Sequence, residues 1–509
     1  MEGRKNNRRE RRWWSAAVSL CACGMFALTA DVGHVDAAED LAICDQVEDE
    51  LFFDQAVTSA MIDVTCSEGI VTLEGSVTNL LEKERAQKLA ETVRGVRSIV
   101  NLIEVRPDTS LSDDAIEDNI EVAWWNDPAT ESYEVDVDVH QGKATLTGTV
   151  DSWQERQLSE YVAKGVAGVV AVDNRIAIDY PDSRIDSEIE HDVRQALRRD
   201  VFLDGGLLID LSVEDGEVLL TGTVGSAFEK QRARTIAWVT GVKNVDASQL
   251  KVEDWVGDQQ ERDTAYPTLS DSEVVEAVND ALLYDPRTNS FNVDVSSING
   301  YVTLRGQVDN LKAKRAAEQD ARSTIGVHSV SNRLKVRSNN DATDAEIRER
   351  IEEALLRNPY TDSFEISVIV NAGIVDLYGT VDTAFEKAEA DDVAARVNGV
   401  VWVDNNLLTT DEYQSYLYDP LVDGYDPYSY DWYDFDPRTT FESDTEIKQS
   451  IEDELWWSPF VDANQVTVSV VNGEATLTGT VDSRMELQAA AENAIEGGAT
   501  SVDNDLVIR

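Results

Sequence analysis

The fold is decided by a nine-residue pattern whose clearest copy is GKATLTGTV, at residues 142–150. The pattern G-x-[VA]-x-L-x-G-x-V occurs six times in the 509 residues, and its first glycine recurs at Gly69, Gly142, Gly216, Gly300, Gly373 and Gly473. Its second glycine lies at Gly75, Gly148, Gly222, Gly306, Gly379 and Gly479. Successive copies start 73, 74, 84, 73 and 100 residues apart, which predicts an array of small domains and not one large enzyme.

Each copy lies in the same predicted order of helix, strand, strand, helix, strand. The opening segment spaces apolar residues four apart, as in Ile116, Ile120 and Trp124, which is typical of a helix with one buried stripe. Alternating apolar residues then predict a strand, as at 135–139. The first glycine suits the following hairpin turn because glycine tolerates a positive φ.

A capping box predicts the second helix in five of the six copies. A cap residue is followed three positions later by glutamate in Asn79/Glu82, Ser152/Glu155, Ser226/Glu229, Thr383/Glu386 and Ser483/Glu486, whereas Asn310 lacks the glutamate. A later glycine ends this helix, and a last strand follows, for example at 172–178. We therefore predict an α+β protein of six small αββαβ domains, each a three-stranded mixed sheet with two helices on one face.

This order of elements, with glycines in these places, resembles the BON domain family of bacterial envelope proteins. The resemblance divides the chain into BON-like domains at 40–107, 111–180, 184–253, 269–337, 341–409 and 444–509. It implies a periplasmic or surface location, association with membrane phospholipid or envelope assemblies, and a link to osmotic or envelope stress. It also implies no catalytic activity, and only the structural glycines carry over from the family.

The N-terminus predicts export. Residues 13–30 are largely apolar and follow a basic cluster of Arg4, Lys5, Arg8, Arg9, Arg11 and Arg12. Basic residues ahead of an apolar stretch are typical of a secretory signal peptide, which we place at 1–37. An uncleaved anchor stays open because the stretch is near the roughly 18 residues that can span a membrane. Cys21 and Cys23 leave a lipoprotein open as a weaker alternative.

The chain is strongly acidic, with 98 Asp and Glu against 44 Lys and Arg and a formal net charge of −54. This charge should repel anionic lipid headgroups, and it argues against nucleic acid as a partner. Contact with a membrane would need aromatic insertion, zwitterionic lipid or a bridging divalent cation such as Ca²⁺. Alternatively, the acidity serves only solubility.

The sequence lacks the parts of an enzyme. Its histidines, His34, His140, His191 and His328, occupy non-equivalent places, and no phosphate-binding loop, nucleophile elbow or metal-ligand spacing is present. We predict no catalytic residues, no cofactor, no metal site and no small-molecule substrate. The oligomeric state stays open.

Two cysteines remain beyond the predicted leader, Cys44 and Cys66. Cys66 lies at an inward strand position and Cys44 beside the buried stripe of the helix that should cover this strand. A disulfide is therefore a candidate in an oxidising envelope, and two buried thiols are the alternative.

The ends of the first helices are candidate contact sites. Equivalent positions at these ends hold Phe53, Asn126, Arg199, Tyr284, Arg357 and Trp457. The preceding positions hold Phe52, Trp125, Arg198, Leu283, Leu356 and Trp456, so neither position requires an aromatic ring for folding. We therefore name Phe53, Trp125 and Trp457 as candidate contacts with a membrane or a partner. The alternative is that these rings cap the cores of small domains.

Two segments between the repeats are predicted linkers: 254–268, and an acidic, tyrosine-rich stretch at 410–443. We expect the domains to behave as loosely coupled units, most freely around the second linker. The predicted function is an exported, envelope-associated binding module for phospholipid or envelope protein. The alternative is an acidic structural or stress-protective spacer with no specific ligand.

Overall fold

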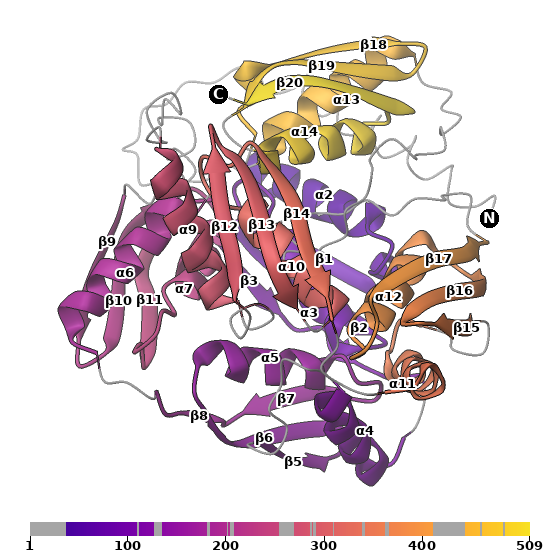
Figure 1. Ribbon diagram of the computed structural model, residues 1–509. Coiled ribbons are helices and arrows are strands. Elements are labelled where there is room, and N and C mark those ends of the chain that lie inside the picture. Colours follow the sequence, from indigo (N-terminus) through magenta and orange to yellow (C-terminus); the bar gives the residue numbers. More distant parts are fainter. Residues whose placement is uncertain are drawn as a thin grey trace, which may run out of the picture.

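The computed structural model describes residues 37–108, 111–126, 135–180, 184–200, 202–203, 208–253, 269–285, 288, 292–308, 310–337, 342–361, 366–410, 443–458, 461–481 and 484–508. Residues 1–36 of the predicted leader, the linker at 254–268 and residues 411–442 of the second linker lie outside these residues. Within them the chain builds one α+β unit six times (Figure 1).

The first three domains follow the predicted order of elements. Domain 1 contains α2 (Ala37–Phe53), β1 (Ile62–Ser67), β2 (Ile70–Val77), α3 (Leu80–Glu91), β3 (Ser98–Asn101) and β4 (Glu104–Val105). Domain 2 contains α4 (Asp113–Asn126), β5 (Val135–His140), β6 (Lys143–Val150), α5 (Trp153–Lys164), β7 (Ala171–Asn174) and β8 (Ala177–Ile178). Domain 3 contains α6 (Asp186–Arg199), β9 (Ile209–Glu214), β10 (Glu217–Val224), α7 (Ala227–Ile236) and β11 (Asn244–Val252).

The last three domains repeat this order with an unbroken third strand. Domain 4 contains α9 (Asp271–Tyr284), β12 (Val293–Ile298), β13 (Tyr301–Val308), α10 (Leu311–Arg322) and β14 (Ser329–Val336). Domain 5 contains α11 (Asp344–Arg357), β15 (Ile366–Asn371), β16 (Ile374–Val381), α12 (Ala384–Ala395) and β17 (Trp402–Thr409). Domain 6 contains α13 (Asp444–Trp457), β18 (Val466–Val471), β19 (Glu474–Val481), α14 (Arg484–Glu496) and β20 (Ser501–Ile508).

Each sheet is mixed, and its middle strand belongs to the hairpin. In domain 4, β13 pairs antiparallel with β12 and parallel with β14. In domains 1 and 2 the third strand is split in two, and in domain 3 a bulge interrupts the pairing of β10 with β11. Both helices cover one face of the sheet, so the inward side chains form a separate core in each domain, as Ile351 of α11 does with Leu377 of β16.

The two glycines of the repeat have different structural roles. Gly69 closes the hairpin turn with φ +72° after Glu68 with φ +54°, the pair of positive φ values expected of a type I′ turn. Gly75 lies in β2, where a Cβ would come within 2.0 Å of the carbonyl oxygen of Met61. The first glycine therefore shapes the turn, and the second lets two strands approach closely.

The predicted caps form with one change. Ser226 accepts a hydrogen bond from the backbone N–H of Glu229. The Glu229 carboxylate, however, accepts a hydrogen bond from the N–H of Gly225, one residue before the cap. Asn310 caps α10 without a glutamate by accepting from the N–H of Ala313. The side chain of Ser483 lies outside the described residues.

The domains pack against one another, which corrects the prediction of loosely coupled units. Domain 1 lies among the others in Figure 1, and its Glu84 pairs with Lys164 of domain 2 at 2.7 Å. Leu80, the first residue of α3, belongs to the core of domain 2, and Leu311, the first residue of α10, to that of domain 5. Helix starts thus serve as docking points between domains, a role that the repeat pattern does not encode.

Candidate contact sites and clefts between domains

Cys44 of α2 and Cys66 of β1 form a disulfide, with 5.7 Å between their Cα atoms. The bridge joins the first helix of domain 1 to the sheet beneath it. It constrains one domain, and it contributes no reactive thiol because both sulfur atoms are used.

The three candidate aromatic residues lie on three different domains and differ in exposure. Trp125, at the end of α4, is 75% exposed, whereas the adjacent Trp124 is 1% exposed and donates from Nε1 to the carbonyl oxygen of Ser159 at 2.9 Å. Phe53 is half-buried and lies edge-on to Phe52, with ring centres 5.8 Å apart. Trp125 is therefore the candidate that presents most of its surface to solvent.

Trp457 is half-buried because the end of α13 docks on domain 1. Its side chain packs against the core of that domain. Beside it, the Arg94 guanidinium lies 4.7 Å from the ring centre of Trp456 and donates to the Trp456 carbonyl oxygen at 3.4 Å. This aromatic tip contacts a neighbouring domain within the chain.

The same kind of contact, between the end of a first helix and a loop of another domain, recurs elsewhere in the chain. The N–H of Ala167, in the loop that ends α5, donates to the carbonyl oxygen of Arg357 at the end of α11, at 2.8 Å. The N–H of Ile325, in the equivalent loop of domain 4, donates to the carbonyl oxygen of Arg199 at the end of α6, at 3.3 Å. First-helix ends thus bind late loops of other domains in three places.

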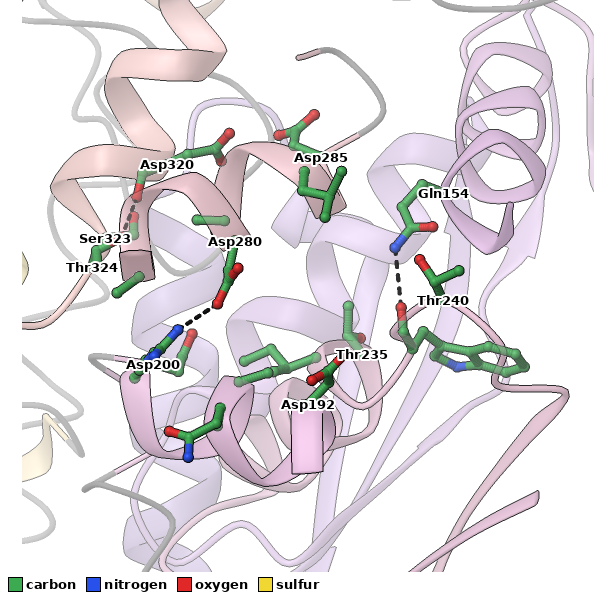
Figure 2. Close-up of a pocket in the computed structure, with 18 of the residues that line it drawn as sticks. Gln154, Asp192, Asp200, Thr235, Thr240, Asp280, Asp285, Asp320, Ser323 and Thr324 are labelled. Carbon is green, nitrogen blue, oxygen red and sulfur yellow. Dashed lines mark hydrogen bonds and ion pairs between the residues drawn. The ribbon is translucent and has the colours of Figure 1, made fainter. Parts of the chain in front are cut away.

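A cleft of about 560 Å³ opens where domains 2, 3 and 4 meet (Figure 2). Trp153 of domain 2 stacks on Trp238 of domain 3, with ring centres 5.3 Å apart, and Gln154 donates to the Trp238 carbonyl oxygen at 3.0 Å. Across the cleft, Arg199 pairs with Asp280 of domain 4. The cleft is therefore a joint between domains.

Ion pairs satisfy many of the charges that line this cleft. Asp192 pairs with Arg184 at 2.8 Å, and Asp200 with Arg232 at 2.7 Å. Burial raises the pKa of Asp280, and the nearby Arg199 partly opposes that shift. Asp192, Asp200 and Asp280 are thus each paired with an arginine in the wall of the cleft.

The three histidines in the part of the chain that the structure describes lie in different domains. His140, His191 and His328 lie in domains 2, 3 and 4 respectively, and His328 stacks on Tyr301 with ring centres 6.4 Å apart. Within the described ranges, no group of three or more His, Cys, Asp or Glu side chains is placed to hold a metal ion. His34 lies outside these ranges.

One recurring contact escaped the sequence analysis. An aspartate in the first turn of each first helix accepts hydrogen bonds from the two residues of the hairpin turn, as Asp113 does from the N–H groups of Gln141 and Gly142 at 2.8 and 2.9 Å. The equivalent residues are Asp40, Asp186, Asp271, Asp344 and Asp444. These hydrogen bonds lower the pKa of Asp113. The signal was available, because each aspartate precedes its glycine by 29 or 30 residues.

A family model described as the BON domain matches residues 39–107, 112–180, 185–254, 270–338, 343–411 and 443–509. The chain belongs to the BON domain family. Over 200 residues it is 30% identical to osmotically-inducible protein Y of Escherichia coli strain K12, an alignment that covers 38% of this chain and 92% of that protein.

Two solved structures of CdsD, a structural protein of the type III secretion system of Chlamydia trachomatis, also resemble parts of this BON-domain chain. They are 18% and 17% identical and cover 47% and 44% of this chain and 100% and 99% of their own, with TM-scores of 0.12 and 0.11.

None of the helices in the described ranges is long and apolar enough to cross a membrane.

Proposed function

We propose that this BON-domain protein is exported and acts without catalysis as an envelope-associated binding module during osmotic or envelope stress. Its similarity to an osmotically inducible protein and the basic, then apolar, N-terminus support this proposal. The contact with phospholipid or with an envelope protein is made by the end of α4, and the mature protein begins after the predicted leader.

The exposure of Trp125 carries the proposal. Its neighbour Trp124 fills the core of domain 2, so the helix end is anchored and the second ring projects from a rigid base. An indole ring is well suited to a boundary that is apolar on one side and wet on the other.

Charge restricts which surface this tip can meet. Asp118 and Glu121, both exposed, lie on the same helix. An anionic lipid surface would repel them, so insertion of Trp125 requires zwitterionic lipid, a bridging divalent cation or an apolar site on a protein.

The test is association of the mature protein with zwitterionic and anionic liposomes, with and without Ca²⁺. We expect Trp125→Arg to leave the melting temperature nearly unchanged and to weaken association with zwitterionic liposomes at least about tenfold, because it removes the inserted ring. The control is Trp402→Ser, which removes another exposed tryptophan in domain 5 and should leave liposome association unchanged.

Equal association of the parent and Trp125→Arg would overturn this assignment of the contact. If the parent protein binds neither liposomes nor an envelope protein, the alternative of an acidic spacer without a specific ligand replaces the proposal.

A further inference from the structure

The outer face of the domain 5 sheet is unusually apolar. Its helices α11 and α12 cover the inner face, where Val375, Leu377 and Val403 are buried. Five large side chains point away from that core and remain 43–69% exposed: Ile369, Ile374, Tyr378, Trp402 and Leu408. We call these five residues the apolar face.

Strand pairing gathers the apolar face into one surface. Ile374 of β16 pairs with Trp402 of β17, and Ile369 of β15 pairs with Asp376 of β16. Tyr378 lies two residues beyond Asp376 on the same side of the strand. The five side chains therefore belong to neighbouring strands of one sheet and share its outer side.

The other five domains show that folding does not require apolar residues at these positions. The pair equivalent to Ile374 and Trp402 is Ile70/Ser98, Lys143/Ala171, Glu217/Asn244, Tyr301/Ser329 or Glu474/Ser501. The position of Tyr378 is taken by Glu74, Thr147, Thr221, Arg305 or Thr478. An exposed apolar surface without a role in folding is typical of a binding site.

Two carboxylates lie within the apolar face. Asp376 pairs in register with Asp404 on the adjacent strand. The equivalent pairs are Thr72/Val100, Thr145/Asp173, Leu219/Asp246, Thr303/Ser331 and Thr476/Asp503, so domain 5 has two acids where the others have one or none. The three strands of domain 5 contain no lysine or arginine.

These charges decide between occupants of the face. Two copies packed face to face would bring four carboxylates together, and an anionic membrane would meet two fixed negative charges. A positively charged partner instead relieves the repulsion between Asp376 and Asp404. Trp402 and Tyr378 add ring faces that attract cations.

We propose that the apolar face, with Asp376 and Asp404, binds a cationic amphipathic segment of a partner protein, in which lysines or arginines are interspersed with apolar residues. The apolar side chains of the partner cover Ile374, Trp402 and Leu408, and its basic groups meet the two carboxylates. This surface lies on a different domain from Trp125, so either proposal can fail alone.

The first test measures binding of a synthetic peptide of alternating lysine and leucine to the mature protein by calorimetry. The triple variant Ile374→Glu, Tyr378→Thr and Trp402→Ser copies the residues of domain 6. We expect at least about tenfold weaker binding, since the apolar contact is lost. The variant is also one charge more acidic, so peptide attracted only by overall negative charge would bind it equally or more tightly.

The second test separates the carboxylates from the general acidity. Asp376→Asn with Asp404→Asn should weaken peptide binding about tenfold and reduce its salt dependence. The matched control, Glu474→Gln with Asp503→Asn, removes two acids from the corresponding face of domain 6 and should leave binding unchanged. Equal effects of the two double variants would overturn the proposal.

Hydrogen exchange on the unmodified protein gives a readout that does not depend on the folding of any variant. The peptide should slow amide exchange in 366–409 more than in 466–508 of domain 6. Equal protection of the two segments would also overturn the proposal. Two other results would overturn the proposal. If the protein forms a dimer that the triple variant abolishes, the occupant is a second copy; if the triple variant abolishes binding to phospholipid vesicles, the occupant is a membrane.

Discussion

At the scale of single residues, the aspartate in the first turn of each first helix connects two parts of the domain that lie far apart in sequence. Its carboxylate accepts the N–H groups of a turn whose two residues both have positive φ, as Asp271 does from Asn299 and Gly300. A charged acceptor satisfies donors that the turn leaves unpaired. The contact therefore stabilises both the helix start and the hairpin.

The pH dependence of this contact can be predicted. Hydrogen bonds lower the pKa of both Asp113 and Asp271 in the folded chain. The largest contribution comes from the backbone N–H of Gly142 for Asp113 and from the Ser297 side chain for Asp271. A lowered folded-state pKa contributes stability that is present above the unfolded pKa and is lost as pH falls through the folded pKa. We expect Asp113→Asn with Asp271→Asn to lower the melting temperature at neutral pH. The difference from the parent should shrink as pH falls below about 4.

Melting curves of the parent and the double variant, recorded between neutral and acidic pH, check this prediction. A difference in melting temperature that stays constant across the range would show that the ionised carboxylates do not stabilise the turns.

A second residue-scale prediction concerns the glycine of the middle strand. Gly75→Ala should cost more than about 1 kcal/mol of unfolding free energy, because the new Cβ would collide with the Met61 carbonyl oxygen at a positive φ. The control is Gly165→Ala, at a helix end with φ −76° and a nearest atom 3.5 Å from the Cβ position, which should be nearly neutral. Chemical denaturation of both variants measures the contrast.

At the scale of single elements, adjacent tryptophans at the end of α4 have opposite environments. Trp124→Ala should cost about 3–5 kcal/mol of unfolding free energy, since it empties a buried site and removes the hydrogen bond to Ser159. Trp125→Ala should change stability by less than about 0.5 kcal/mol, because the ring is mostly exposed. Chemical denaturation measures the unfolding free energy of the two variants. Similar losses of unfolding free energy would contradict the assignment of one buried and one exposed ring.

The elements themselves could be predicted from sequence because their signals are local and occur six times. Four-residue spacing along α11, alternation along β5 and the glycines of the hairpins each follow from backbone geometry. The capping boxes of α9, α11 and α13, at Ser270, Thr343 and Ser443, were equally local and were missed. Sequence reasoning left open whether Trp125 and Trp457 are exposed or cap a core, and the partial burial of Trp457 depends on another domain.

At the scale of the whole molecule, the docking of domains could not be predicted from the repeat. Arg94 contacts Trp456, which lies 362 residues later in the sequence. These contacts depend on individual pairs of residues and not on the period of the repeat. Sequence reasoning therefore reached the domains but not their assembly.

The joint between domains 4 and 5 gives the most direct test of that assembly. Arg315 of α10 pairs with Asp391 of α12, and beside them Lys312 pairs with Asp392, which is 1% exposed. Arg315→Asp places a carboxylate against Asp391 in a partly buried site, and removing one partner of a buried pair costs about 3–5 kcal/mol. We expect the two domains to separate, so that the radius of gyration measured by small-angle X-ray scattering increases.

Adding Asp391→Arg to Arg315→Asp reverses the pair and should restore a compact molecule, because the opposite charges again face each other. The single variant Asp391→Arg should open the joint as Arg315→Asp does. If the parent already has a large radius of gyration, and if none of the three variants changes it, the domains are loosely coupled in solution. Expansion in both single variants and recovery in the double variant would instead establish that this ion pair holds domains 4 and 5 together.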